Sequence, residues 1–251
     1  EILAFRDKAA EENESIQTSD QRRAELSGEI AALQERASRA ALALSQERQK
    51  RAREMETRVM EELAFLGMAK TVFKVDIRYV RDPEGFIEVR GERIRLFETG
   101  VDHVEFLVSP NPGEEARPLR KIASGGEMSR IMLAFKSVLS SRNDCETLVF
   151  DEVDAGIGGV TASAVGKKLR QVSGGHQVLC ITHLPQIAAM ADQHIMVSKS
   201  VADGRTRTQI RHLAHDERLA ELARMLGGEV VSETTLQQAR EMIEMGQGGP
   251  S

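Results

Sequence analysis

The first 66 residues show a helical pattern of apolar positions. The segment contains no proline and one glycine, Gly28, and it is rich in Glu, Arg, Gln and Ala. Apolar residues recur seven apart on one track, which Arg23 interrupts: Ile2, Ala9, Ile16, Ile30, Ala37 and Leu44. A narrow seam of this kind predicts a coiled-coil arm over residues 1–66, which needs a second helix as its partner. A helix packed on its own globular domain is the alternative.

Two features interrupt this pattern. Thr18, Ser19 and Asp20 could cap a new helix, which allows a break near residues 13–20. The seam fades after Ser45 and resumes in a shifted register at Met55, Val59 and Leu63.

Beyond Gly67 the apolar period changes from helical to two, which predicts short strands with turns between them. The expected strands of this antiparallel region cover 73–79, 86–89, 94–97 and 104–108. A turn is expected at 82–85, and Asn111-Pro112-Gly113 ends the region.

From residue 121 onward, apolar strands alternate with helical segments. We expect helices at 127–140 and 160–172, and strands at 146–150 and 177–181. This alternation implies crossover connections and a parallel sheet, hence an α/β lobe over residues 67–246. A short helix at 185–191, strands at 194–198 and 206–212, and amphipathic helices at 216–226 and 233–245 complete it. Residues 247–251 are predicted to be a disordered tail.

Composition limits the classes of function. The chain has 251 residues, 41% of them hydrophobic, and a net charge of −5, so DNA contact requires a local basic patch. Two cysteines, Cys145 and Cys180, are too few for a disulfide framework, which fits a reducing cytoplasm. No apolar run reaches the roughly 18 residues of a membrane span, so no membrane partner is expected. The chain starts without Met inside a helical pattern, and we expect a fragment.

Three motifs carry candidate chemistry. Asp151 and Glu152 follow an apolar strand, where one carboxylate can hold Mg²⁺ and the other can polarise a water molecule. Ser124-Gly125-Gly126 precedes a helix and offers an anion site at its positive end. His183 follows the next strand and can hydrogen-bond a terminal phosphate. Taken singly, an acidic turn, an ordinary N-cap and a core histidine are strong structural alternatives.

The order of these motifs resembles the signature, Walker B and switch-histidine motifs of ATP-binding-cassette ATPases with coiled-coil arms. The amino-acid sequences of these motifs are similar to those of the RecN family of SMC-like bacterial DNA repair proteins. The matching stretches are IASGGEMSRIML at 122–133, FDEVDAGIGG at 150–159, THLPQIA at 182–188 and ELARMLGG at 221–228. The fold that this resemblance implies is the C-terminal lobe of an ABC/SMC-type ATPase head, with a largely parallel sheet, an antiparallel region and a long N-terminal coiled-coil arm.

The resemblance also implies roles for residues. Ser124, Gly125 and Gly126, with Glu127, would contact the γ-phosphate of ATP held by a second copy. Asp151 would bind Mg²⁺, Glu152 would orient the attacking water, and His183 would contact the γ-phosphate and sense its presence. The loop that starts at Asp154 would contact the partner in a dimer of heads.

Three features depart from the family pattern. Ala123 stands where many cassette proteins have Leu, and Gly158 stands where SMC-type heads usually have Asp. No Gly-x4-Gly-Lys-Ser/Thr loop is present; the string Gly166-Lys167-Lys168 lies in an expected helix and is interpreted as a solvated face. We therefore expect the returning arm and C-terminal lobe, which alone would hydrolyse ATP negligibly. The N-terminal lobe and the other coiled-coil strand would supply the rest.

The resemblance implies a cytoplasmic, nucleoid-associated protein that uses ATP to drive double-strand break repair by recombination. Its expected partners are DNA, particularly double-stranded ends, and a second copy bound through the heads. Two basic groups could touch phosphates, although a solvated helix face is the alternative for the first: Arg36, Arg39, Arg48, Lys50, Arg51, Arg53 and Arg58; and Arg205, Arg207 and Arg211. Alternative functions are another SMC-like head in chromosome organisation and a non-catalytic coiled-coil tether.

Overall fold

A computed structural model describes residues 2–111, 113–139, 146–202, 205–228, 230–246 and 248. Cys145, Pro112 and, apart from Gly248, the expected tail lie outside these residues. The chain divides into two compact units. The first consists of Glu1–Arg53 and Val75–Glu105, and the second of Glu54–Lys74 and Phe106–Ser251. Within the described residues, no helix combines the length and apolar character needed to cross a membrane.

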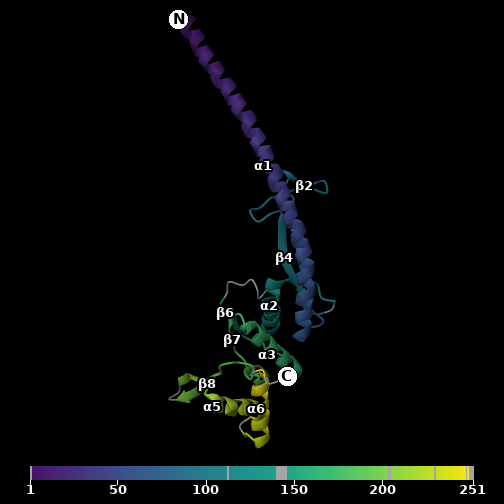
Figure 1. The fold of residues 1–251 in the computed structure, drawn as a ribbon, viewed down its shortest axis with the longest axis vertical. Coiled ribbons are helices and arrows are strands. Elements are labelled where there is room, and N and C mark those ends of the chain that lie inside the picture. Colours follow the sequence, from purple (N-terminus) through teal and green to yellow (C-terminus); the bar gives the residue numbers. More distant parts are fainter. Residues whose placement is uncertain are drawn as a thin grey trace. The chain divides into compact units, whose positions relative to one another are not determined.

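Helix α1 spans Ile2–Phe65 without interruption (Figure 1). The break considered near residues 13–20 does not occur. A Ser, Thr or Asp inside a helix is less favourable than Ala by only about 0.5 kcal/mol each, and the segment has no proline to remove a hydrogen bond. Three neighbouring polar residues are therefore insufficient to end a helix of this length.

In the first unit, α1 carries both an exposed and a packed face. Leu26, Ile30 and Leu33 are 40–59% exposed, whereas Ala41 is buried in a cluster with Ile87, Ile94 and Val101. Strands β2 (Ile87–Val89) and β3 (Glu92–Ile94) form the antiparallel hairpin that supplies two of these residues. The side chain of Asp102 is fully buried, and its carboxylate accepts hydrogen bonds from Ser45 (2.6 Å) and Arg48 (3.1 Å).

The packed-helix interpretation therefore holds at Ala41, Val59 and Leu63 of α1. Val59 and Leu63, where the apolar seam resumes in a new register, are fully buried in the second unit. Ile30 and Leu44 of the earlier seam are exposed, whereas Val59 and Leu63 of the resumed seam are packed. The pairing of the exposed seam with another helix stays a prediction.

A three-stranded sheet has the order β1-β4-β5, formed by Val72–Tyr79, Asp102–Ser109 and Arg117–Pro118. In the second unit, Phe73 of β1, Phe106 of β4 and Phe135 of α2 make a contiguous aromatic group with ring centroids 5.0–5.7 Å apart. The 3₁₀ turn η1 (Leu119–Lys121) leads from β5 towards α2 (Gly125–Leu139). This packing anchors the helix that begins at the glycine turn.

The parallel part of the structure is β6 (Thr147–Phe150) paired with β7 (Gln177–Cys180), with α3 (Gly159–Ser173) as the crossover. Helices α2 and α3 lie beside these strands (Figure 1). The α/β class is as predicted, although this parallel sheet contains only two strands among the described residues.

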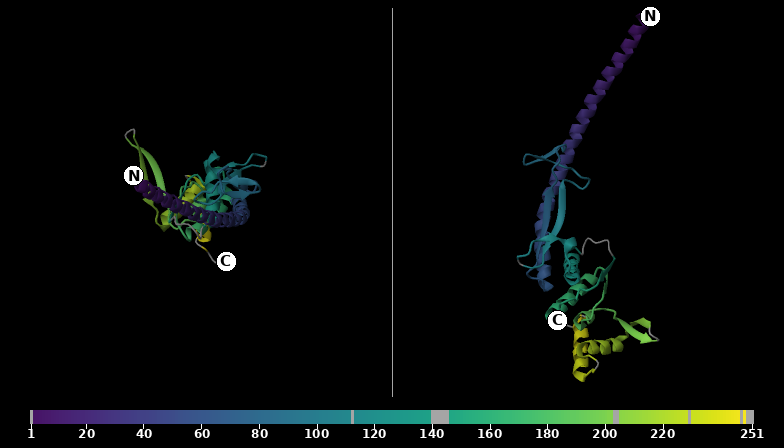
Figure 2. Two further views of the ribbon diagram at one scale, coloured as in Figure 1. Left: turned by 90° about the horizontal axis from the view of Figure 1, so that it is seen from above. Right: turned by 180° about the vertical axis from the view of Figure 1, so that it is seen from behind.

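Strands β8 (Ile195–Ala202) and β9 (Arg205–His212) form a separate antiparallel hairpin, which projects from the second unit (Figure 2). They do not extend the parallel sheet. A parallel neighbour needs a crossover of a dozen or more residues, and β9 starts only three residues after β8 ends.

The C-terminal helices α5 (His215–Gly227) and α6 (Glu233–Gly246) pack on each other and on the short helix α4 (Pro185–Ala188). The buried Arg218 of α5 donates hydrogen bonds to three carbonyl oxygens at the end of α4, those of Ala188, Ala189 and Ala191. Gly228, with φ +79° and ψ −149°, ends α5 in a positive-φ conformation that glycine adopts readily. This bundle supports the segment that directly follows His183.

One expectation about α3 is wrong. Lys167 is exposed, but Lys168 is only 7% exposed, so the Gly166-Lys167-Lys168 string is not a solvated face. The Lys168 ammonium lies 2.6 Å from a Glu62 carboxylate oxygen and 5.1 Å from the ring centre of Phe65. A lysine is buried where it is paired, and here both partners come from the end of α1.

Candidate nucleotide-binding site

The ends of β6 and β7 place the acidic pair and the histidine at one sheet edge. Phe150 is the register partner of Cys180, and the backbone N–H of Ile181 donates to the carbonyl oxygen of Phe150 at 3.0 Å. Asp151 and Glu152 therefore leave one strand where His183 leaves its neighbour. The structure confirms this expected proximity.

Asp151 and Glu152 are both exposed, in a sharp turn. Glu152 has φ +56°, an unusual conformation for a residue with a side chain that stores about 1–3 kcal/mol of strain. Its N–H donates to Asp151 Oδ1 at 2.9 Å, and the hydroxyl of Ser129 on α2 donates to the Asp151 carbonyl oxygen at 2.6 Å. Neighbouring hydrogen bonds thus hold the backbone of the turn, in which both residues remain exposed.

The glycine turn lies against this acidic turn. As expected, it precedes a helix, α2, and a Cβ added to Gly125 would come within 1.9 Å of Glu152 Oε2. A Cβ on Gly126 would meet Ala155 Cβ at 2.8 Å and the Glu152 carbonyl oxygen at 3.1 Å. At position 126, where the near atoms include backbone oxygens, only glycine allows α2 to approach the chain after β6 so closely; at position 125 the near atoms belong to the Glu152 side chain.

The residues beside these glycines act as helix-start groups. Ser124 Oγ accepts a hydrogen bond from the backbone N–H of Glu127 at 3.4 Å. Ser124 is therefore an N-cap, which is the structural role considered for it in the sequence analysis. Ser124 and Gly125 are exposed, and Glu127 is half-buried. The exposed start of α2 can therefore still offer backbone N–H groups to an anion.

Arg130 is a site residue that sequence reasoning missed. It is 7% exposed and donates to the carbonyl oxygens of Val153 (3.3 Å) and Ala155 (2.9 Å). Burial lowers the pKa of Arg130, and the nearby Glu127 carboxylate opposes this effect. Its position four residues after Gly126, on the same helix face, is the signal that could have identified it.

Asp154 has a different environment from the one expected of a loop that contacts a partner. It is 4% exposed, and its Oδ2 accepts hydrogen bonds from Thr182 Oγ1 at 2.6 Å and from the N–H of His183 at 2.9 Å. Nδ1 of His183 lies 3.1 Å from the same oxygen. The carboxylate faces the histidine turn of its own chain.

The edge has a negative electrostatic character. The pKa of Cys180 is raised to about 12, mainly by burial and further by Asp154 and Asp151. The described residues contain no group of three or more His, Cys, Asp or Glu side chains that could hold a metal ion. Most ligands of a divalent ion at this edge would therefore have to come from groups other than these side chains. Mg²⁺ fits this condition, because it often binds through one or two carboxylates, phosphate oxygens and water.

One face of the β6–β7 pair is uncovered. Leu148 and Phe150 are buried, whereas Val149 is 65%, Leu179 46% and Ile181 61% exposed. Parallel strands are normally covered on both faces.

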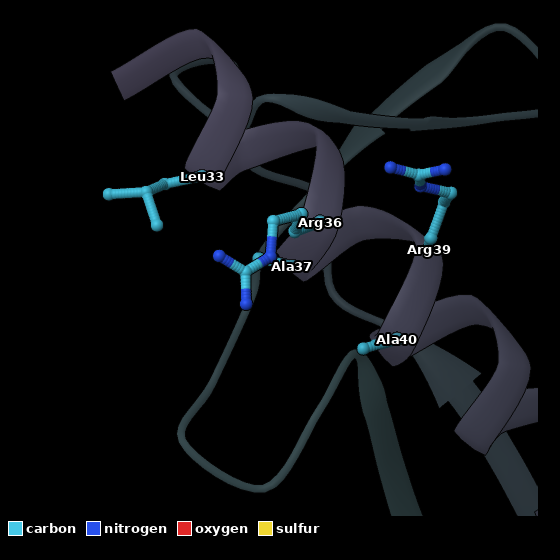
Figure 3. A pocket seen from close by; sticks show the side chains of 5 residues that line it. All are labelled: Leu33, Arg36, Ala37, Arg39 and Ala40. Carbon is cyan, nitrogen blue, oxygen red and sulfur yellow. The ribbon is translucent and has the colours of Figure 1, made fainter. Parts of the chain in front are cut away.

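Some cations of the two basic groups are paired with carboxylates. A shallow hollow on α1 is lined by Leu33, Arg36, Ala37, Arg39 and Ala40 (Figure 3). The guanidinium groups of Arg36 and Arg39 point away from each other (Figure 3), and Arg39 pairs with Glu35 at 3.6 Å. In the second basic group, Arg211 is paired with Glu217. Contact of either group with DNA phosphates stays a prediction.

The chain resembles curated RecN proteins. It is 40% identical over 246 residues to the DNA repair protein RecN of Bacillus subtilis. The matched region covers 97% of this chain and 43% of that protein. The RecN of Treponema pallidum is 43% identical over 246 residues, covering 98% and 42%. The RecN of Halalkalibacterium halodurans is 44% identical over 203 residues, covering 81% and 34%. The chain thus spans less than half the length of these relatives.

Other comparisons are less informative. No family model matches the chain. Among solved structures, an SMC ATPase from a study of ATP-driven dimerisation and DNA-stimulated activation is 17% identical with a TM-score of 0.40, covering 72% of this chain and 96% of that one. The Smc head domain with coiled coil from Pyrococcus yayanosii is 20% identical with a TM-score of 0.44, covering 67% and 28%. TM-scores of this size support no inference about function.

Proposed function

Because this chain is RecN-like along 97% of its length, we propose that it is part of an SMC-like DNA repair ATPase. In this proposal, residues 1–66 are one strand of a coiled-coil arm, and residues 67–246 are the C-terminal lobe of the ATPase head. The missing Gly-Lys-Ser/Thr phosphate loop would come from the N-terminal lobe, which would also cover Val149, Leu179 and Ile181. The other strand of the arm would cover the exposed seam.

The observation that carries the proposal is the meeting of the acidic pair, the histidine and the glycine turn within one chain. Glu152 is exposed and held in a fixed turn, so its carboxylate can orient and accept a proton from a water molecule. Asp151 would hold Mg²⁺, which neutralises phosphate charge when bound. His183, 74% exposed in its side chain, would hydrogen-bond the terminal phosphate.

Ser124, Gly125 and Gly126, with Glu127 in the first turn of α2, would bind ATP held by a second copy. Closure of two heads on ATP, and their release after hydrolysis, would act through the arm on DNA ends during recombinational repair of double-strand breaks. The protein would work in the cytoplasm at the nucleoid.

The test uses the complete protein, with this chain joined to its N-terminal lobe. We expect Mg²⁺-dependent ATP hydrolysis that Glu152→Gln lowers at least 100-fold, because the water loses its base. Ser124→Arg should leave a folded monomer that no longer dimerises with ATP, as measured by light scattering. Equal hydrolysis by the Glu152→Gln protein would refute the water-orienting role, and complete absence of hydrolysis in the parent would favour a non-catalytic tether. Undiminished dimerisation of Ser124→Arg would refute the trans contact.

A further inference from the structure

We propose that Ser129 and Arg130, neighbours on α2, are the positioning residues of the acidic pair, and that they keep the Glu152 carboxylate where it can act on water. This inference rests on the proposed function, because it concerns the residue that would orient the attacking water. In this proposal neither side chain touches the nucleotide. Both act through the backbone on the two sides of Glu152.

The hydrogen bonds from α2 lie on both sides of Glu152 along the chain. Before it, the Ser129 hydroxyl donates to the Asp151 carbonyl oxygen at 2.6 Å. After it, Arg130 Nη1 donates to the carbonyl oxygens of Val153 at 3.3 Å and of Ala155 at 2.9 Å. Two successive residues of one helix therefore hold the backbone that carries the Glu152 side chain.

The backbone conformation of Glu152 needs such support. Its φ of +56° is strained for a residue with a side chain. The net contribution of a few hydrogen bonds to stability is of the same order as the cost of one strained residue. Without the bonds from α2 the turn can relax to a negative φ, and this rotation would move the Glu152 carboxylate relative to Asp151. Strain that surrounding contacts maintain is concentrated at functional sites.

The chemistry of Arg130 favours positioning over simple packing. Its side chain is buried, and both acceptors of Nη1 are uncharged carbonyl oxygens. Within the part of the chain that the structure describes, its Nε is buried without a hydrogen-bond partner. A buried charge of this kind is a poor way to fill a core, because apolar side chains of similar volume stabilise at least as well. The two bonds to the segment after Glu152 are therefore the better explanation for an arginine at this position.

Hydrolysis by the complete protein tests the role of Arg130. We expect Arg130→Met to lower kcat for ATP about tenfold or more while the KM changes less than about threefold, because a misplaced catalytic group slows the reaction more than it weakens binding. The double variant Arg130→Met/Glu152→Gln should hydrolyse ATP within about twofold of Glu152→Gln alone, because Arg130 acts through Glu152. The Glu152 side chain takes no part in the bonds from α2, so Glu152→Gln leaves those bonds in place.

Arg218→Met is the matched control for the loss of a buried arginine. Arg218 is 5% exposed, its Nε also has no hydrogen-bond partner among the described residues, and it donates to carbonyl oxygens at the end of α4. These acceptors do not belong to the acidic turn. We expect Arg218→Met to lose thermal stability as well, but to hydrolyse ATP within about threefold of the parent.

The outcomes separate two failures. No hydrolysis by the parent, or a Glu152→Gln protein as fast as the parent, refutes the proposed function or its water-orienting residue, and this inference with it. A slow Glu152→Gln protein together with a fast Arg130→Met protein, or with losses that multiply in the double variant, overturns only the positioning role. An Arg218→Met protein as slow as Arg130→Met overturns it as well, because the cause would then be a general loss of packing.

A milder variant covers an Arg130→Met protein that fails to fold. Ser129→Ala removes one hydroxyl and its single bond to the turn, so kcat should fall about threefold, with no further loss when it is combined with Glu152→Gln. Ser163→Ala is its control, because the half-buried Ser163 hydroxyl donates to the Gly159 carbonyl oxygen of its own helix, α3, at 3.3 Å. A Ser129→Ala protein that hydrolyses ATP as fast as Ser163→Ala would overturn the proposal.

Discussion

The buried ion pair at the base of the arm gives the most direct stability test. Glu62→Gln removes the carboxylate 2.6 Å from the Lys168 ammonium and keeps the size of the side chain. The Lys168 side chain is 9% exposed, so its charge would lose its anionic partner in a site with little water. Breaking a fully buried pair costs about 3–5 kcal/mol.

Two remaining contacts reduce that figure. Lys168 also donates to Gln171 Oε1 at 2.9 Å and lies 5.1 Å from the Phe65 ring centre, and a cation–π contact at a desolvated site contributes about 1–2 kcal/mol. Glu62 itself is 24% exposed, so part of its charge is already solvated. We therefore expect Glu62→Gln to destabilise the second unit by about 2 kcal/mol.

Urea unfolding followed by hydrogen exchange of 54–66 and 160–173 would measure this change. With a slope of about 2 kcal/mol per M, the midpoint should fall by about 1 M. Glu35→Gln is the control, because its pair with Arg39 has a distance of 3.6 Å and both side chains are at least 70% exposed. Exposed pairs contribute about 0–1 kcal/mol. Equal midpoints for the two variants would refute the anchoring of α1 to α3.

Three further predictions concern the site. Gly126→Ala should destabilise the chain by about 1–3 kcal/mol in thermal unfolding, because its Cβ meets the fixed backbone at Glu152 and Ala155. Gly125→Ala should change stability by less than about 0.5 kcal/mol, since its Cβ meets only the movable Glu152 side chain, but it should slow hydrolysis. Equal stability losses in the two glycine variants would contradict both stability predictions. In a Cys145→Ser background, Cys180 with a pKa of about 12 should resist iodoacetamide at pH 8 until urea unfolds the chain. Because the pKa of Cys180 in the folded chain lies above the ordinary 9.0, the stability that the buried neutral thiol contributes is complete below pH 9 and is lost as the pH rises towards 12. Fast alkylation of the folded chain would refute the burial of this thiol.

Local patterns in the sequence predicted most elements of the fold. The alternation at Phe73–Tyr79 and the apolar runs before Asp151 and His183 each became a strand, because these signals depend on neighbouring residues only. The shared edge of Asp151, Glu152 and His183 followed from the rule that parallel strands end together.

Features that depend on distant residues were not predictable in the same way. The burial of Lys168 requires Glu62, which lies on another helix far away in sequence. The direction of β9 depends on the length of its connection to β8, and the periodicity of apolar residues carries no information about it. The orientation of Asp154 towards His183 likewise depends on the turn at Glu152. The positive φ of this turn could not be predicted from the sequence, because glutamate rarely adopts it.

The contacts around residues 151–155 limit how the candidate site can respond to a ligand. Ser129 and Arg130 bind this segment to α2, and Asp154 binds it to the histidine turn. Backbone carbonyl oxygens accept the bonds from α2, so substitution of the acidic side chains would leave that connection in place. The glycine turn, the acidic pair and His183 should therefore shift together, with the Glu152 side chain as the group free to move. Under the proposed function, a phosphate at Gly125 would repel the carboxylate that now lies against that glycine and turn it away from α2.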